Sequence, residues 1–193
     1  TYAAFIEGIP EAATGVIFIL VTYNLIGGVG WLMLFISPMV FWLWARNLFF
    51  ASFLIVIFVY DFRWYLILDK VTLPAMVAAV LFNVFLGLSL INLIIAAVVA
   101  FVFFLLQFAF SQGKWIGGGD LRLGVLMGLM LGWPNIIVAL FFAYIIGAVF
   151  SLALIAMGKK GFKSRTPFGT FLALGTFIAL LYGEAVLGGI LAY

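Results

Sequence analysis

The sequence has 193 residues, of which 68% are hydrophobic and 8% are charged, with a formal net charge of +3. Soluble domains average about 45–50% apolar and about 25% charged residues. This composition therefore excludes a soluble enzyme and indicates a protein embedded in membrane lipid. The small net charge makes nucleic acid an unexpected partner. Cysteine and histidine are both absent, which excludes disulfides and catalysis by Cys/His or Ser/His/Asp groups, and we expect no metal site.

Breaks marked by charge, Gly and Pro divide the chain into seven apolar runs. A bilayer core about 30 Å thick needs roughly 20 apolar residues per helix, and no run alternates with the period of two that membrane β-strands require. We therefore predict an all-α, polytopic membrane protein: a bundle of about seven transmembrane helices in a single domain, residues 1–193, with no cleavable signal peptide. In chain order the predicted helices cover 10–27, 37–61, 72–90, 91–111, 120–132, 134–157 and 167–183.

The basic residues predict the orientation of these helices. Eight of the nine fall near alternate loops, which lie on one side of a seven-helix bundle. The positive-inside rule makes that side cytoplasmic, with the N-terminus inside and the C-terminus outside. Arg46, within the second predicted helix, is expected to snorkel outward. The eight are Arg63, Lys70, Lys114, Arg122, Lys159, Lys160, Lys163 and Arg165.

Two of the six acidic residues stand out by their positions. Asp61 ends a long apolar run, and Asp120 follows three glycines. The run from Asp120 to Gly132 is too short to cross a bilayer at about 1.5 Å per residue, so Asp120 is expected in a partly dry site, where a carboxylate is costly unless it is used. A simple cap at a helix N-terminus is the alternative for Asp120. Asp61 has no such role, because a helix C-terminus repels negative charge.

The other acids have plainer interpretations. Asp69 adjoins Lys70, and we expect it to cap a helix or form an ion pair at the surface. Glu7, Glu11 and Glu184 are expected to lie at the membrane interfaces.

Glycines surround Asp120. Gly117, Gly118 and Gly119 allow positive φ or the close approach of another segment, but the Walker lysine that a phosphate loop needs is missing. The following glycines recur every fourth residue, which is a small-residue stripe on which a neighbouring helix packs. We predict that this neighbour is the helix that carries Asp61. The stripe consists of Gly124, Gly128 and Gly132.

Four segments form an ordered set of motifs. They are PEAATG at 10–15, YDFRWYLILDKVTLP at 60–74, GGGDLRL at 117–123 and PFGTFLALG at 167–175. Together they resemble the type IV prepilin peptidases, a family of GxGD intramembrane aspartic proteases. Leu68 and Thr170 stand where this family has proline, and neither is expected to touch the aspartates. The family's zinc-binding cysteine tetrad has no counterpart here.

The resemblance implies a membrane aspartic endopeptidase with Asp61 and Asp120 as its catalytic pair. It implies cleavage of the leader peptide of prepilins or pseudopilins at the cytoplasmic face of the cell membrane, for type IV pilus assembly or protein secretion. Peptide cleavage needs no cofactor, whereas N-methylation of the product, where retained, uses S-adenosylmethionine. The supporting or substrate-binding residues are then Asp69, Gly117, Gly118, Gly119 and Arg122.

The aspartate pair suits this chemistry, since two close carboxylates share one proton. The ionised member can take a proton from water while the protonated member polarises the peptide carbonyl. Two alternatives stay open. One is a presenilin-like protease that acts on other substrates, and the other is a proton or cation transporter with paired aspartates.

Overall fold

The computed structural model describes residues 14–24, 36–158 and 166–191, and within these ranges every regular element is a helix. This confirms the predicted all-α class. Glu7, Glu11 and the basic loop at 159–165 lie outside the described residues. After a short helix at Thr14–Asn24, the elements are α3 (Pro38–Trp64), α4 (Asp69–Phe85), α5 (Leu90–Ser111), α6 (Gly118–Leu131), α7 (Asn135–Ala156) and α8 (Phe168–Leu191).

The predicted boundaries of the described helices hold closely except at both ends of α4, which covers Asp69–Phe85 and not 72–90, and at the end of α8. Ser37 and Pro38 begin α3 as expected, although the Ser37 side chain makes no capping hydrogen bond. α4 begins at Asp69, so Pro74 lies inside that helix instead of at its start. The backbone carbonyl of Leu68 accepts the first N–H bonds of α4, which places the start of the helix one turn earlier than the proline suggested. α8 continues beyond the predicted end to Leu191.

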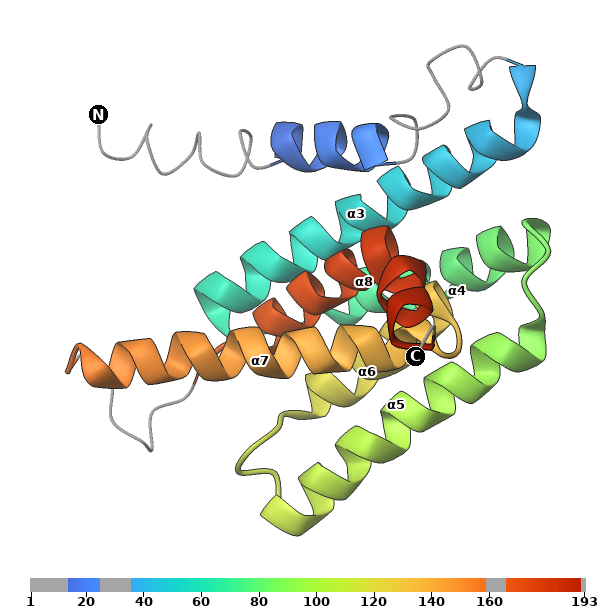
Figure 1. The fold of residues 1–193 in the computed structure, drawn as a ribbon. Helices are drawn as coiled ribbons and strands as arrows, with labels where there is room; N and C mark the ends of the chain where they lie inside the picture. The colour runs from blue at the N-terminus through green and yellow to red at the C-terminus, as the bar shows by residue number, and fades with distance from the viewer. Residues whose placement is uncertain (1–13, 25–35, 159–165, 192–193) are drawn as a thin grey trace.

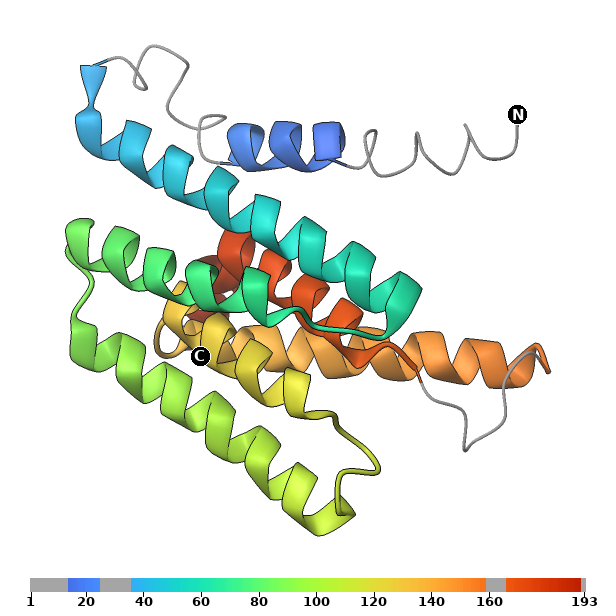
Figure 2. The same cartoon turned by 180° about the vertical axis from the view of Figure 1, so that it is seen from behind.

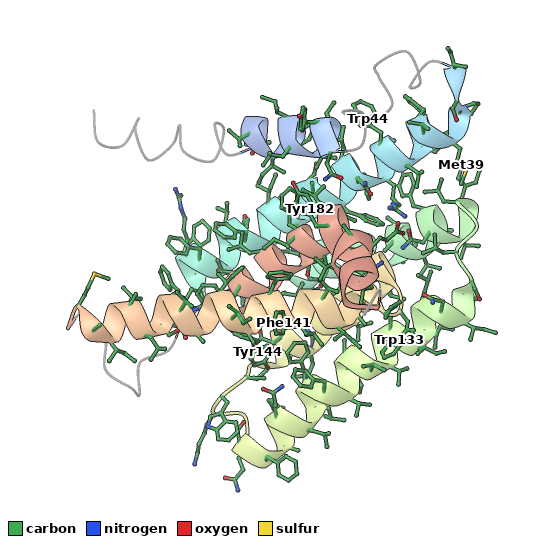
Figure 3. All side chains as sticks on the ribbon, viewed as in Figure 1. Met39, Trp44, Trp133, Phe141, Tyr144 and Tyr182 are labelled. Carbon is green, nitrogen blue, oxygen red and sulfur yellow. The ribbon has the colours of Figure 1, made fainter. Side chains whose placement is uncertain are left out.

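Within the described residues, four helices, α3, α5, α7 and α8, are long and apolar enough to cross a membrane. α4 has 17 residues and α6 has 14, and at 1.5 Å per residue the latter is about 21 Å long, too short to span a bilayer. Many large apolar side chains lie on the outside of the bundle, among them Met39 of α3 and Phe141 of α7, as Figure 3 shows. A surface of this kind suits lipid. The orientation of the termini stays a prediction.

The two inner helices are α6 and α8, and α3, α4, α5 and α7 pack around them (Figures 1 and 2). α6 packs against α4, α5, α7 and α8, while α8 packs against α3, α6 and α7. Fully buried side chains of α6, including Leu123, Leu126 and Met127, form the middle of the apolar core. α6 is therefore held on several sides by longer helices.

The glycine stripe of α6 packs against α5, so the prediction that it faces the helix with Asp61 is wrong. A Cβ atom on Gly128 would lie 2.5 Å from the Cα of Ala97 and 2.6 Å from the carbonyl carbon of Ala96. A Cβ on Gly124 would collide with the ring of Phe104. The reason is that α5 offers small residues to the stripe, whereas the inward face of α3 carries the bulky side chains Phe50, Leu54 and Ile57.

Arg46 turns into the bundle and does not snorkel outward. Its guanidinium donates hydrogen bonds to Asn47 Oδ1 at 2.9 and 3.1 Å and to Asn83 Oδ1 at 3.1 Å. Asn83 in turn donates to the carbonyls of Leu129 and Met130, at 2.7 and 3.0 Å. These carbonyls belong to the last turn of α6, where no intrahelical donor remains. Arg46 and Asn83 thus satisfy polar groups at the end of α6 that lies farthest from Asp120.

Candidate active site

Asp61 lies one turn before the end of α3 and is bound by the start of α8. Its side chain is 5% exposed. The Thr170 backbone N–H donates to Asp61 Oδ2 at 2.6 Å, and the Thr170 hydroxyl donates to the same oxygen at 3.0 Å. Thr170 is the third residue of α8, so its N–H is one of the donors that a helix N-terminus leaves without an intrahelical acceptor. The expectation that position 170 does not touch the aspartates is therefore wrong.

Gly169 allows this close approach of α8 to α3. A Cβ atom built on Gly169 would lie 2.9 Å from Asp61 Cγ, 3.0 Å from Asp61 Oδ2 and 2.9 Å from Ile67 Cδ1. Any other residue would push the carboxyl group or the loop aside. Glycine at position 169 thus leaves the candidate catalytic group in place, whereas a Cβ atom there would displace it or Ile67.

Asp120 is the third residue of α6 and is held by its own helix start. Its side chain is 8% exposed, and Oδ2 accepts a hydrogen bond from the Gly117 N–H at 2.9 Å. Burial raises the pKa of the Asp120 carboxyl to about 6, the Gly117 hydrogen bond opposes this shift, and the negative charge of Asp61 adds to it. An acid with this pKa can hold a proton more readily near neutral pH than an ordinary aspartic acid.

None of the three glycines before Asp120 has a positive φ, and only Gly119 lies close to another segment. Gly117 has a φ of −83° as the N-cap of α6, and none of the three is among the positive-φ glycines of the described residues. A Cβ atom on Gly119 would lie 3.0 Å from the Cβ of Ile67. Ile67 therefore fits against Gly119 on one side and Gly169 on the other, in the loop that follows Asp61.

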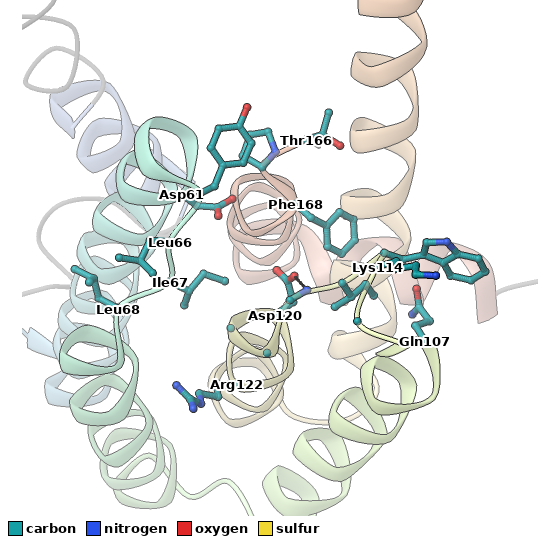
Figure 4. Close-up of a pocket in the computed structure, with 18 of the residues that line it drawn as sticks. Asp61, Leu66, Ile67, Leu68, Gln107, Lys114, Asp120, Arg122, Thr166 and Phe168 are labelled. Carbon is teal, nitrogen blue, oxygen red and sulfur yellow. Dashed lines mark hydrogen bonds between the residues drawn. The ribbon is translucent and has the colours of Figure 1, made fainter. Parts of the chain in front are cut away.

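Both aspartates line one pocket of about 1230 Å³. Figure 4 shows their carboxyl groups pointing toward the same space, Asp61 from α3 and Asp120 from the start of α6. The loops that follow α3, α5 and α7 contribute to the lining, so these alternate loops meet at one end of the bundle as the basic residues predicted. Other lining residues are Tyr65, Leu66, Ile67, Leu68, Gln107, Lys114, Trp115, Ile116, Tyr144, Thr166, Pro167 and Phe168.

Asp69 and Arg122 meet at this pocket as an ion pair between the start of α4 and the first turns of α6. Their side chains are 48% and 54% exposed, so the pair is a surface one, as expected for Asp69. Its partner is Arg122, 53 residues away in sequence, and not the adjacent Lys70. The predicted supporting residues Asp69, Arg122 and Gly117–Gly119 all line the same pocket.

Sequence reasoning missed two further features in and behind the pocket wall. The Tyr144 hydroxyl of α7 donates to Gln107 Oε1 of α5 at 2.7 Å. A glutamine within an otherwise apolar helix was the available signal. Thr170 was noticed as a departure from the family motif, but its contact with Asp61 could not be inferred from the motif itself. Among the described residues no three metal-ligating side chains gather in one place.

Comparisons with known proteins agree with the resemblance of the segments that contain Asp61 and Asp120. The model of the Type IV leader peptidase family matches residues 48–152, a range that contains both Asp61 and Asp120. No solved structure matches the chain.

Several curated relatives carry the name prepilin leader peptidase/N-methyltransferase. The one from Bacillus subtilis (strain 168) is 30% identical over 145 residues, covering 72% of this chain and 56% of its own length. The one from Aeromonas salmonicida (strain A449) is 33% identical over 123 residues, which cover 61% of this chain and 42% of the relative. The one from Burkholderia pseudomallei (strain 1026b) is 33% identical over 129 residues, covering 63% and 42%. This chain spans about half the length of these relatives, and it belongs to the type IV leader peptidase family.

Proposed function

We propose that this protein is a membrane aspartic endopeptidase in which Asp61 and Asp120 are the catalytic pair. The observation that carries the proposal is the convergence of two buried carboxylates, from separate helices, on one pocket. Buried acids in a membrane protein are costly and mark functional sites. Two carboxylates that face each other cannot both ionise comfortably, so the pair titrates jointly and retains one proton over part of the pH range.

The mechanism uses this shared proton. The ionised member takes a proton from a water molecule, which attacks the carbonyl carbon of the scissile peptide bond. The protonated member donates its hydrogen bond to the carbonyl oxygen, where negative charge develops. Collapse of the tetrahedral intermediate breaks the C–N bond, and the departing amine receives a proton from the pair. No covalent enzyme intermediate forms.

The substrate we propose is a prepilin or pseudopilin, cut between its short basic leader and its apolar helix. The pocket lies at the end of the bundle that carries Lys114 and Arg122, which the positive-inside rule places in the cytoplasm. Asp69 is the lining acid that could attract a basic leader, and its ion pair with Arg122 must then open. The protein is accordingly a multi-pass protein of the cell membrane with its active site on the cytoplasmic face.

N-methylation is named for the relatives and would use S-adenosylmethionine as its methyl donor. The cationic sulfonium of that cofactor needs an anionic or aromatic partner. The three carboxylates that line the described pocket already have partners, Thr170 for Asp61, Gly117 for Asp120 and Arg122 for Asp69. The described pocket therefore offers no carboxylate without a partner to this cofactor, whereas aromatic side chains, among them Trp115 and Phe168, do line it. We assign no methyl-transfer step to these residues.

Cleavage of a synthetic prepilin peptide by the purified protein in detergent tests the proposal. We expect a single cut after the leader, detected by mass spectrometry, and no cut by Asp61→Asn or Asp120→Asn. A second incubation with S-adenosylmethionine tests methylation through the mass of the product. Cleavage within the apolar helix would instead support a presenilin-like protease, and proton uptake into vesicles without cleavage would support a transporter.

The side of the membrane is tested by cysteine labelling, since the chain has no cysteine. Gln112→Cys, between α5 and α6, should react from the cytoplasmic side, and Ser89→Cys, between α4 and α5, from the outside. Reaction of both from one side would contradict the proposed topology.

A further inference from the structure

Thr170 contacts Asp61 but does not line the pocket. Its side chain is 2% exposed, and the described lining of the pocket ends at Phe168 on this segment. The backbone N–H and the hydroxyl of Thr170 both donate to Oδ2 of Asp61. We propose that Thr170 is a positioning residue that fixes the orientation of the Asp61 carboxyl group toward the reacting peptide. This inference rests on the proposed peptidase function.

The geometry explains how two donors on one oxygen can act in this way. The carboxyl group of Asp61 is connected to α3 by a side chain that can rotate about χ1 and χ2. The backbone N–H of Thr170 is held in place by α8, and the hydroxyl of the same residue donates a second hydrogen bond to Oδ2. Together they restrain the plane of the carboxyl group, and with it the direction of Oδ1. Hydrogen bonds to a charged acceptor are among the stronger ones in proteins.

The residue type at position 170 is what makes this arrangement available. The family motif that residues 167–175 resemble has proline at this position. Proline lacks a backbone N–H and has no side-chain hydroxyl. A threonine therefore supplies two donors that the family motif does not. Gly169 supports the contact, since it lets the first turn of α8 come close enough to Asp61.

The consequence is a specific kinetic effect. A residue that orients a catalytic group without touching the substrate changes the rate of the chemical step and leaves substrate binding unaltered. Loss of the Thr170 contacts should therefore lower kcat and leave KM unchanged. A purely structural role would lower the amount of folded protein without changing the kcat of the folded fraction.

The test compares Thr170→Val, Thr170→Ser and Thr176→Val in the full chain, purified in detergent and assayed with a prepilin peptide. Valine keeps the shape of threonine but removes the hydroxyl, so we expect kcat to fall about tenfold at constant KM. Serine keeps the hydroxyl and should restore kcat to within about twofold. Thr176 is the matched control, because it is a fully buried threonine of the same helix whose hydroxyl bonds Leu172 O at 2.7 Å, away from Asp61.

A second variant keeps the inference testable if the valine effect is small. Thr170→Pro removes both donors, and proline is tolerated in the first turn of a helix, so α8 should still form. We expect a larger fall in kcat than for Thr170→Val, with the thermal unfolding temperature of each variant measured alongside. A kcat equal to that of the wild type in both variants would overturn the inference, as would a serine variant as slow as the valine variant or an effect confined to KM. If the wild type itself does not cleave the peptide, the proposed function fails instead.

Discussion

The two aspartates are buried to nearly the same extent, but they are held in different ways. Asp120 is bound by Gly117, three residues earlier in the same helix start. Asp61 is bound by Thr170, which lies 109 residues later in the sequence. One carboxyl group is therefore oriented by local structure and the other by tertiary packing of α8 on α3. The pair exists only when α3, α6 and α8 are correctly placed together.

The supports of the two helices differ as well. α6 is fixed along its length, by α5 through the glycine stripe and by Asn83 at its last turn. The end of α3 that carries Asp61 is followed by a short loop, and its main polar restraint is α8. We therefore expect Asp120 to be displaced through changes far along α6, and Asp61 through changes at the start of α8.

The largest expected effect comes from removing either carboxylate. Asp61→Asn and Asp120→Asn should each lower kcat by on the order of 10²–10⁴, the range of general acid–base catalysis. Because the pair shares one proton, the double variant should be no worse than either single one. The measurement is the rate of prepilin peptide cleavage by folded protein. Substantial turnover by one single variant would show that the two aspartates do not act as a pair.

Displacement of the whole of α6 should have the next largest effect. Gly128→Leu forces α6 away from the backbone of Ala96 and Ala97, and a shift of about 1 Å at a catalytic group can cost about a hundredfold in rate. We expect kcat to fall by about that factor, although Gly128 lies far along α6 from Asp120. Gly189→Leu in α8 is the control, since no atom lies within 4 Å of its Cβ position. Full activity of the Gly128 variant would indicate that α6 tolerates separation from α5.

A smaller substitution probes the side of Asp61. Gly169→Ala places a methyl group 2.9 Å from Asp61 Cγ, so the carboxyl group or α8 must give by a few tenths of an ångström. We expect kcat to fall by about tenfold, less than a full 1 Å displacement would cause. Gly188→Ala, in the same helix and with open space at its Cβ position, should have wild-type kcat. Equal activity of the two variants would show that the Asp61 contact can relax without loss.

The smallest effect is expected at the rim of the pocket. The Asp69–Arg122 pair is half exposed, and such pairs contribute roughly 0.2–1 kcal/mol to stability, so neither Asp69→Asn nor Arg122→Gln should unfold the protein. If Asp69 binds the basic leader, Asp69→Asn should raise KM a few-fold, and Arg122→Gln, which frees Asp69, should lower it. These shifts should diminish at high salt. A KM that responds to neither change would remove Asp69 from substrate binding.

Local patterns in the sequence were enough for much of this protein. The apolar runs predicted the helices, because a segment in lipid must satisfy its own backbone hydrogen bonds. The spacing of basic residues predicted which loops lie together, and the acids at two helix ends indicated Asp61 and Asp120. Each of these signals can be read along the chain without knowing which helices contact one another.

The tertiary structure alone decided which surfaces meet. The stripe at Gly124 and Gly128 required a close neighbour, but any helix with small residues satisfies that need, and the alanines of α5 do so better than α3. In the same way, Asp61 needed a donor that sequence motifs could not name, because the free N–H groups of every helix N-terminus are chemically alike. Thr170 provides it because α8 packs against α3, and that packing depends on the shape of the whole core.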